Sequence, residues 1–177
     1  MSKKKVNPRR IPLGKAAIDT KQIIQDAMKD DMRHAWYLVA SALLETELAK
    51  PEEIPDLFDE CNRYSRTANA VMSKLGHAEE ITGRKRPARL DSNHIKSQVE
   101  LDKYRKNVEK MALHTSLCVI CLGLEKRFSS EELKRLFLVE NLTEAEIDSG
   151  HLDYNQLELQ LQSRNVRIGL DPEAPLS

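Results

Sequence analysis

The sequence predicts an all-α protein, a helical bundle of about five to seven helices. Three observations point to this fold class. Apolar residues recur at spacings of three and four along most of the chain, which is the periodicity of an amphipathic helix. No segment alternates for long enough to form a strand, apart from a very short extended piece at 166–168. Charged residues make up 32% of the chain, which suits helices with solvated outer faces.

The chain opens with a basic arm, residues 1–15, that we expect to be flexible or extended. Pro8 and Pro12 prevent a continuous helix there, and the arm contains no acidic residue. Its cations are Lys3, Lys4, Lys5, Arg9, Arg10 and Lys15.

Helical patterns follow from Asp19 onwards. The first runs to about Lys50, and Pro51 then opens a second helix, since proline needs no hydrogen-bond donor in a first turn. The run 68–75 either extends that second helix or forms another, and Gly76 is the predicted stop. Residues 76–92, which include the basic run at 84–86, are predicted to form an exposed loop.

The second half of the chain repeats this succession. A long helix is predicted over residues 93–127, and Ser129 with Glu132 has the spacing of a capping box for the next helix. Residues 143–146 repeat that capping-box spacing. The last helix is predicted near 154–164, with Leu157 and Leu161 on one face, and residues 171–177 are a flexible tail.

A shift of 79 residues aligns two parts of the chain without a gap. Over 31 positions the aligned parts share eight identities, from Met32 on Met111 to Asn62 on Asn141. We therefore expect one helical domain, residues 16–170, built from two pseudo-repeats at about 19–75 and 93–164 that pack together to bury their apolar faces. The alternative is that any two amphipathic hairpins look alike.

The largest apolar residues of the two predicted repeats are expected to form the core. They are Trp36, Leu38, Leu43, Leu57, Phe58, Leu117, Leu122, Leu136 and Phe137. The helix at 93–127 carries more apolar surface than one short helix can cover, so a homodimer is a further expectation.

The composition argues against catalysis and against a membrane location. Phosphate-binding glycine loops and nucleophile elbows are absent from the sequence, so we expect no enzyme and no cofactor. Lys plus Arg and Asp plus Glu both number 28, so no overall field attracts nucleic acid or a bilayer. The longest apolar run, 117–122, is far short of a membrane span, and no secretory leader is visible, which predicts a cytoplasmic protein.

The cysteines and histidines are the residues to consider for metal binding and redox chemistry. Cys118 and Cys121 form a CxxC, which in a redox or zinc site sits in a loop or at a helix start. Here the motif lies inside an apolar helical run, so we expect two small buried side chains. The five histidines show no ligand spacing, and no metal site is predicted; they are His34, His77, His94, His114 and His151.

The candidate binding residues are the two basic segments, namely the arm and the loop. The loop contributes Arg84, Lys85, Arg86 and Arg89. These cations could bind phosphates or an acidic protein surface, or they could be solvated charges that balance acids elsewhere. Aromatic residues amount to 5%, which argues against base stacking, and the helix after Ser129 begins with two acids, which argues against a helix-turn-helix.

The opening KKKVNPRRIP, the helix with AWYLVASALLE and the second half from 111 to 170 resemble small helical proteins encoded by phages and prophages of Gram-positive bacteria. The family pattern is shorter, with one long helix, so this chain departs from it by an insertion or duplication between about 45 and 110. The family brings no established activity or site residues.

The resemblance implies a mobile-element protein in a bacterial host cell. Such proteins, anti-CRISPRs and other inhibitors of host defence among them, are often compact binders without catalytic residues. We therefore expect a non-catalytic protein that binds a host or phage protein, with a nucleic-acid-binding regulator that uses the same basic residues as the alternative.

Overall fold

The computed structural model describes residues 19–65, 68–92, 95–166 and 168. This part of the chain contains six α-helices and no strand, which confirms the predicted fold class. The helices are α1 (Thr20–Glu45), α2 (Ile54–Ser65), α3 (Ala68–Thr82), α4 (Gln98–Leu124), α5 (Ser130–Asp148) and α6 (Tyr154–Ser163), with a 3-10 turn at Pro51–Glu53.

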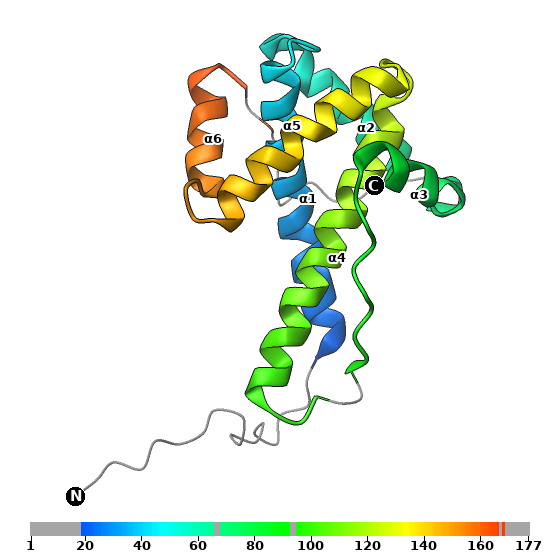
Figure 1. The fold of residues 1–177 in the computed structure, drawn as a ribbon, viewed down its shortest axis with the longest axis vertical. Helices are drawn as coiled ribbons and strands as arrows, with labels where there is room; N and C mark the ends of the chain where they lie inside the picture. Colours follow the sequence, from blue (N-terminus) through cyan, green and yellow to red (C-terminus); the bar gives the residue numbers. More distant parts are fainter. Residues whose placement is uncertain (1–18, 66–67, 93–94, 167, 169–177) are drawn as a thin grey trace, which may run out of the picture.

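The molecule has a head and a stalk (Figure 1). The two longest helices, α1 and α4, run parallel, and their first halves form the stalk, residues 20–31 and 98–111. All other helices lie around their second halves in the head. After α3, residues 84–92 run back along the stalk without regular helix; we call this segment the strap.

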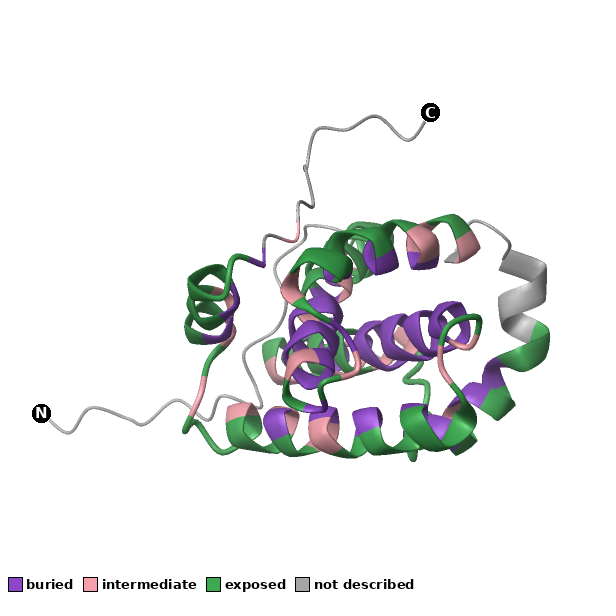
Figure 2. Ribbon diagram, turned by 90° about the horizontal axis from the view of Figure 1, so that it is seen from above, coloured by how far each residue is buried: buried purple, intermediate pink, exposed green. Residues whose placement is uncertain are grey.

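The hydrophobic core lies in the head, where buried residues gather at the centre and the outer helices expose their outward faces (Figure 2). All nine predicted core residues are buried, with Trp36, Leu38, Leu43, Leu117, Leu136 and Phe137 fully inaccessible. A second, smaller cluster holds the stalk together, and its buried members are Ala27, Tyr104, Val108 and Ala112.

Side-chain caps fix where the helices begin. The predicted capping box forms at Ser129 and Glu132, because each side chain accepts a hydrogen bond from the other's backbone N–H. Asp153 and Gln156 form a second box at α6, which the sequence reading missed. The capping-box spacing at 143–146 does not start a helix, since α5 continues through it to Asp148.

The predicted stop at Gly76 is wrong. Helix α3 passes through Gly76 and ends at Thr82, so the basic loop begins seven residues later than expected, at Gly83. Gly83 has φ of 68°, the left-handed conformation that favours glycine after a helix. The long helix predicted over 93–127 is shorter, Gln98–Leu124, and is capped by Ser97, whose side chain accepts from Glu100 N.

The shorter helices pack on the two long ones. Helices α2 and α3 pack on α4, whereas α5 and α6 pack on α1. Helices α1 and α4 end at Glu45 and Leu124, which are 124 − 45 = 79 positions apart, the shift that aligns the two halves of the sequence. This arrangement supports the predicted duplication, whose ancestry stays a prediction.

The reason for expecting a homodimer does not hold in the head. Helix α4 packs against α1, α2 and α3 rather than against one short partner, and all its residues from Ser116 to Leu124 are buried. Among the described residues of α1 and α4, the large apolar side chains that are exposed, Ile24 and Met28, both lie in the stalk.

The approach of α2 to α4 depends on a glycine. A Cβ at Gly123 would lie 2.6 Å from Cys61 Sγ and 3.0 Å from Cys61 Cα. A side chain there would have to push apart two helices of the core. Gly76 of α3, by contrast, has nothing within 4 Å of its Cβ position.

Replacing Gly123 with alanine should therefore destabilise the fold by about 1–3 kcal/mol, the usual cost of overpacking a core. Gly76→Ala is the matched control and should stabilise the fold by about 0.5–1 kcal/mol, because alanine is the better helix former. Urea denaturation followed by circular dichroism measures both. Equal stability of Gly123→Ala and the parent would contradict the close packing of α2 on α4.

Candidate functional site

The stalk carries a groove lined by three segments of the chain. It lies between the stalk helices and the strap and has a volume of about 510 Å³. Its apolar lining comes from Ile24 and Met28 of α1, Leu90 of the strap, and Tyr104, Val108 and Met111 of α4.

Three of the lining side chains remain substantially exposed. Ile24, Met28 and Leu90 leave 44%, 39% and 43% of their surface accessible. Single exposed leucines are ordinary on proteins, but apolar side chains that share one groove are typical of interaction sites. The other large exposed apolar residues, Leu138, Leu142 and Leu159, lie on the outer helices and do not line the groove.

Asn107 of α4 fixes the strap as the third wall of the groove. Its Nδ2 donates to the carbonyl of Ala88 at 2.8 Å, and its Oδ1 accepts from Leu90 N at 3.4 Å. One side chain therefore satisfies both a donor and an acceptor of the strap, which has no helical hydrogen bonds of its own there. This contact sets Leu90 beside the stalk helices.

The four predicted loop cations have different surroundings. The side chain of Arg84 is nearly buried; its Nη2 lies 2.8 Å from Glu140 Oε1 and also contacts Glu144. Arg86 is more exposed and forms an ion pair with Glu79 at 2.9 Å. Lys85 and Arg89 are exposed, and Arg89 also lines the groove.

The predicted binding residues of the arm lie outside the described residues. They are Lys3, Lys4, Lys5, Arg9 and Arg10. Of the predicted binding residues that the structure describes, Arg89 alone lines the groove.

The pair of Arg84 and Glu140 anchors the strap to the head. Glu140 is completely inaccessible to solvent. Burial raises the pKa of Glu140 to about 7, against the opposing attraction of Arg84. The guanidinium nevertheless gives this carboxylate two hydrogen bonds, so the pair links the strap to α5 at the point where α3 ends.

The cysteines are buried, as predicted. Cys118 and Cys121 lie within α4 and face the head core together with Cys61 of α2. Burial raises the pKa of Cys118 to about 11 and that of Cys61 to about 12. The thiols are therefore protonated at neutral pH, which makes them poor nucleophiles and poor metal ligands.

The described part of the chain contains neither a group of metal-ligating side chains nor a helix long and apolar enough to cross a bilayer. The histidines have other neighbours. His77 contacts Glu125 at 2.6 Å, His114 contacts Glu79 at 3.0 Å, and His151 contacts Ser149 at 2.8 Å. His34 stacks on a tyrosine, and His94 lies outside the described residues.

The sequence pattern did not predict the groove. Ile24 and Met28 are four positions apart and so share a helix face, but that spacing also describes core residues. Among the described residues, the strap rather than a helix lies against this side of the stalk, which leaves both side chains exposed. To predict this arrangement, a sequence pattern would have to relate Leu90 and Asn107 to residues of α1.

The structure thus defines a class, an all-α bundle with a two-helix stalk and an apolar groove. In comparisons with family models, with curated proteins and with solved structures, nothing matched the chain. The resemblance to phage and prophage proteins therefore stays a prediction.

Removing Arg84 should destabilise the fold because it leaves Glu140 buried without its partner. We expect Arg84→Met to lose about 3–5 kcal/mol at pH 8, the usual cost of breaking a buried ion pair. Lys85→Met, at the exposed neighbouring position, should change stability by less than about 0.5 kcal/mol. Urea denaturation of both variants measures this. Similar losses for the two variants would show that Arg84 does not anchor the strap.

Glu140 should also give stability a specific dependence on pH. Its pKa is about 7 in the folded protein against an ordinary value of 4.5, so the folded form binds a proton between these values that the unfolded chain does not. This contribution is present below pH 4.5 and is lost as pH rises through 7. The stability of the parent relative to Glu140→Gln should therefore fall between pH 5 and pH 8. Parallel pH profiles for the two proteins would contradict the raised pKa.

Proposed function

We propose that this chain acts by binding another protein, and that the stalk groove receives the apolar face of an amphipathic helix from that partner. The observation that carries the proposal is that Ile24, Met28 and Leu90, on two separate segments, expose apolar surface around one groove. Such surface costs free energy in water and is stabilised when a partner covers it.

The shape of the groove favours a helix as the occupant. Its lining on α4 runs from Tyr104 to Thr115, a length of roughly 17 Å or three helical turns. In the head, the same two long helices are covered by other helices packed on them. A partner helix in the groove would extend this packing to the stalk. Met28 and Met111 adapt their shape to different neighbours, which suits a surface that receives another chain.

The charges around the groove fit a polar rim. Arg89 lines it beside the apolar side chains, so an acidic group of a partner would find a counterpart. Arg84 and Arg86 contribute less than the sequence suggested, because both already form ion pairs within the chain. Lys85, Arg89 and the basic arm remain as cations for a partner.

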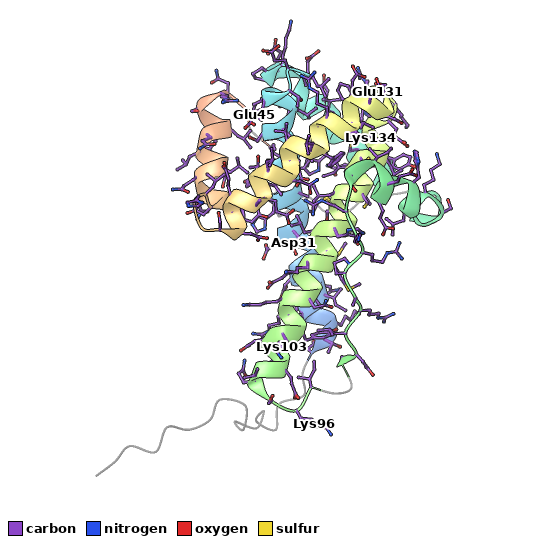
Figure 3. The ribbon with its side chains drawn as sticks, in the orientation of Figure 1. Asp31, Glu45, Lys96, Lys103, Glu131 and Lys134 are labelled. Atoms are coloured by element: carbon purple, nitrogen blue, oxygen red, sulfur yellow. The ribbon has the colours of Figure 1, made fainter. Side chains whose placement is uncertain are left out.

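A nucleic-acid-binding regulator is the second proposal, and one observation favours it. Lys103, Lys106 and Lys110 are exposed on α4 at spacings of three and four, which puts them on one side of the helix. Lys96 and Lys103 both project from the lower stalk (Figure 3). Asp102 and Glu109 lie among these lysines, which weakens the attraction for phosphates.

The biological setting follows from the resemblance and is proposed with it. A phage or mobile-element protein that binds a host protein without catalysis would act as an inhibitor, for example of a defence nuclease complex or as an anti-CRISPR. A homodimer through the same groove is the competing arrangement, since a second stalk could also cover Ile24 and Met28.

The test is a pull-down from a Gram-positive bacterial lysate with and without nuclease treatment. We compare the parent with Met28→Glu, which places a charge in the groove, and with Leu142→Glu, which places the same charge on an exposed leucine of α5. The parent and Leu142→Glu should retain the same protein through nuclease treatment. Met28→Glu should weaken that retention at least tenfold, because burying an unpaired charge is costly.

Two results would overturn the proposal. Equal retention by Met28→Glu would exclude the groove as the binding surface. Recovery of nucleic acid alone, lost after nuclease treatment and steeply weakened by salt, would favour the regulator instead. Light scattering of the purified chain completes the test, because a dimer that Met28→Glu dissociates would show that a second copy occupies the groove.

A further inference from the structure

The charged side chains of the stalk differ between its two hollowed sides. On the side beside the start of α6, a pocket of about 400 Å³ is lined by one guanidinium and four carboxylates, namely those of Arg105, Asp26, Asp30, Asp31 and Glu109. The groove, by contrast, has two charged residues in its lining, Arg89 and Asp91. Asp91 already has an interaction within the chain. The groove therefore offers a cation to a partner, although the chain as a whole carries no net charge.

Arg89 lies nearer to one end of the groove than to the other. Asn107 hydrogen-bonds the strap residues on either side of Arg89, which places Arg89 level with Asn107 on α4. The lining on α4 runs from Tyr104 to Thr115. Arg89 is therefore roughly 5 Å from the end of the groove toward the stalk tip, where α1 and α4 begin, and roughly 12 Å from the end toward the head. It is exposed and forms no ion pair with another described residue, so it is available to a partner.

Helix α1 adds a second cation toward the same end of the groove. Lys21 is exposed and precedes Ile24 by three residues and Met28 by seven, so all three lie on one side of the helix. Lys21 is about one turn nearer to the stalk tip than Ile24 is. Two acids of the same helix, Asp26 and Asp30, line the other pocket instead. Carboxylates of a partner would therefore meet two cations near the tip.

The helix dipoles of the stalk act in the same direction as these cations. The parallel helices α1 and α4 both begin at the stalk tip, and the other described helices lie in the head (Figure 1). Each helix has a partial positive charge at its N-terminus and a partial negative charge at its C-terminus. Asp19 caps α1 and Glu100 lies in the first turn of α4, which offsets part of the positive charge. A third helix that runs antiparallel to both would bring its negative end to the tip.

We propose, on the basis of the groove's proposed function, that the partner helix is acidic in its C-terminal half and lies antiparallel to α1 and α4. Its carboxylates then meet Arg89 and Lys21, while its apolar face covers Ile24, Met28 and Leu90. A basic helix fits less well, because it would bring like charges together at this end of the groove. A second copy of this chain also fits less well, because the groove side of its stalk carries the same cations.

The experiment measures the binding of two fluorescent synthetic peptides to the full chain by fluorescence anisotropy. Both peptides carry the same leucines at every third and fourth position, and they differ in the polar positions of the C-terminal half, which are glutamates in one and lysines in the other. Glutamates near a helix C-terminus weaken the helix and lysines strengthen it. Tighter binding of the acidic peptide would therefore not be a result of its own helix stability.

We expect the acidic peptide to bind the parent about tenfold more tightly at low salt, since exposed ion pairs replace repulsive contacts, and the difference should shrink as salt rises. The double variant Arg89→Gln with Lys21→Gln should reduce the preference to about twofold or less. The matched control is Lys126→Gln with Lys134→Gln, which removes two exposed cations of the head and should keep the preference (Figure 3 labels Lys134). Circular dichroism checks that both double variants fold.

The orientation is measured on the acidic peptide with a nitroxide at one end or the other, from the broadening of amide signals of the chain in NMR spectra. A label at the C-terminus should broaden the amide of Ile24 more than that of Thr115, and a label at the N-terminus should do the reverse. The opposite pattern would overturn the antiparallel arrangement.

The outcomes separate this proposal from the function on which it rests. Equal binding of both peptides to the parent, weakened in both cases by Met28→Glu, would leave the groove as a helix-binding site and overturn the acidic partner. An acidic preference that survives in Arg89→Gln with Lys21→Gln would also overturn it, because the charge would then be recognised elsewhere. If neither peptide bound the parent, both the helix-binding function and the acidic partner would be overturned.

Discussion

The parallel pairing of α1 and α4 is the constraint on which the rest of the structure depends. Antiparallel helices can be joined by a short turn, but two parallel helices need a connection that carries the chain back over their length. The strap makes this return, since the chain climbs α1, builds α2 and α3 in the head and descends before α4 begins. A single extended segment covers less of the stalk than a helix would. The groove between the strap and the two helices is therefore a direct result of the parallel arrangement.

Hydrogen bonds of polar side chains hold the strap and the ends of two helices in this arrangement. The strap is held at the head by Arg84 on Glu140 and at the stalk by Asn107. Helix α5 serves the ends of two other helices, because Arg135 donates to the carbonyl of Thr46 and Asn141 to that of Thr82. At the 79-residue shift, Cys61 corresponds to Glu140. One half of the molecule thus uses a small thiol against Gly123 where the other uses a buried carboxylate, which makes the two halves chemically different.

The sequence predicted the parts of the fold that depend on local pattern. The helical periodicity identified the core around Trp36 and Phe137, and the cap at Ser129 began α5 as expected. The sequence did not predict the features that depend on contacts between residues far apart along the chain. Arg84 belongs to a basic run that looks exposed, and only its contact with Glu140, 56 positions away, makes it structural. Asp31 looks like one of many acids on a solvated helix, and nothing near it in sequence indicates its burial.

The continuity of α1 and α4 has a mechanical consequence. Both helices pass from the head into the stalk without a break, and the stalk parts extend about 18 Å along each helix. Two packed helices resist bending more than a loop does, so the stalk acts as a rigid spacer. If a partner held the molecule by its head, the groove on the stalk would lie at a fixed distance and angle from that contact. Such a molecule would fit only an assembly whose two contact points have the same separation.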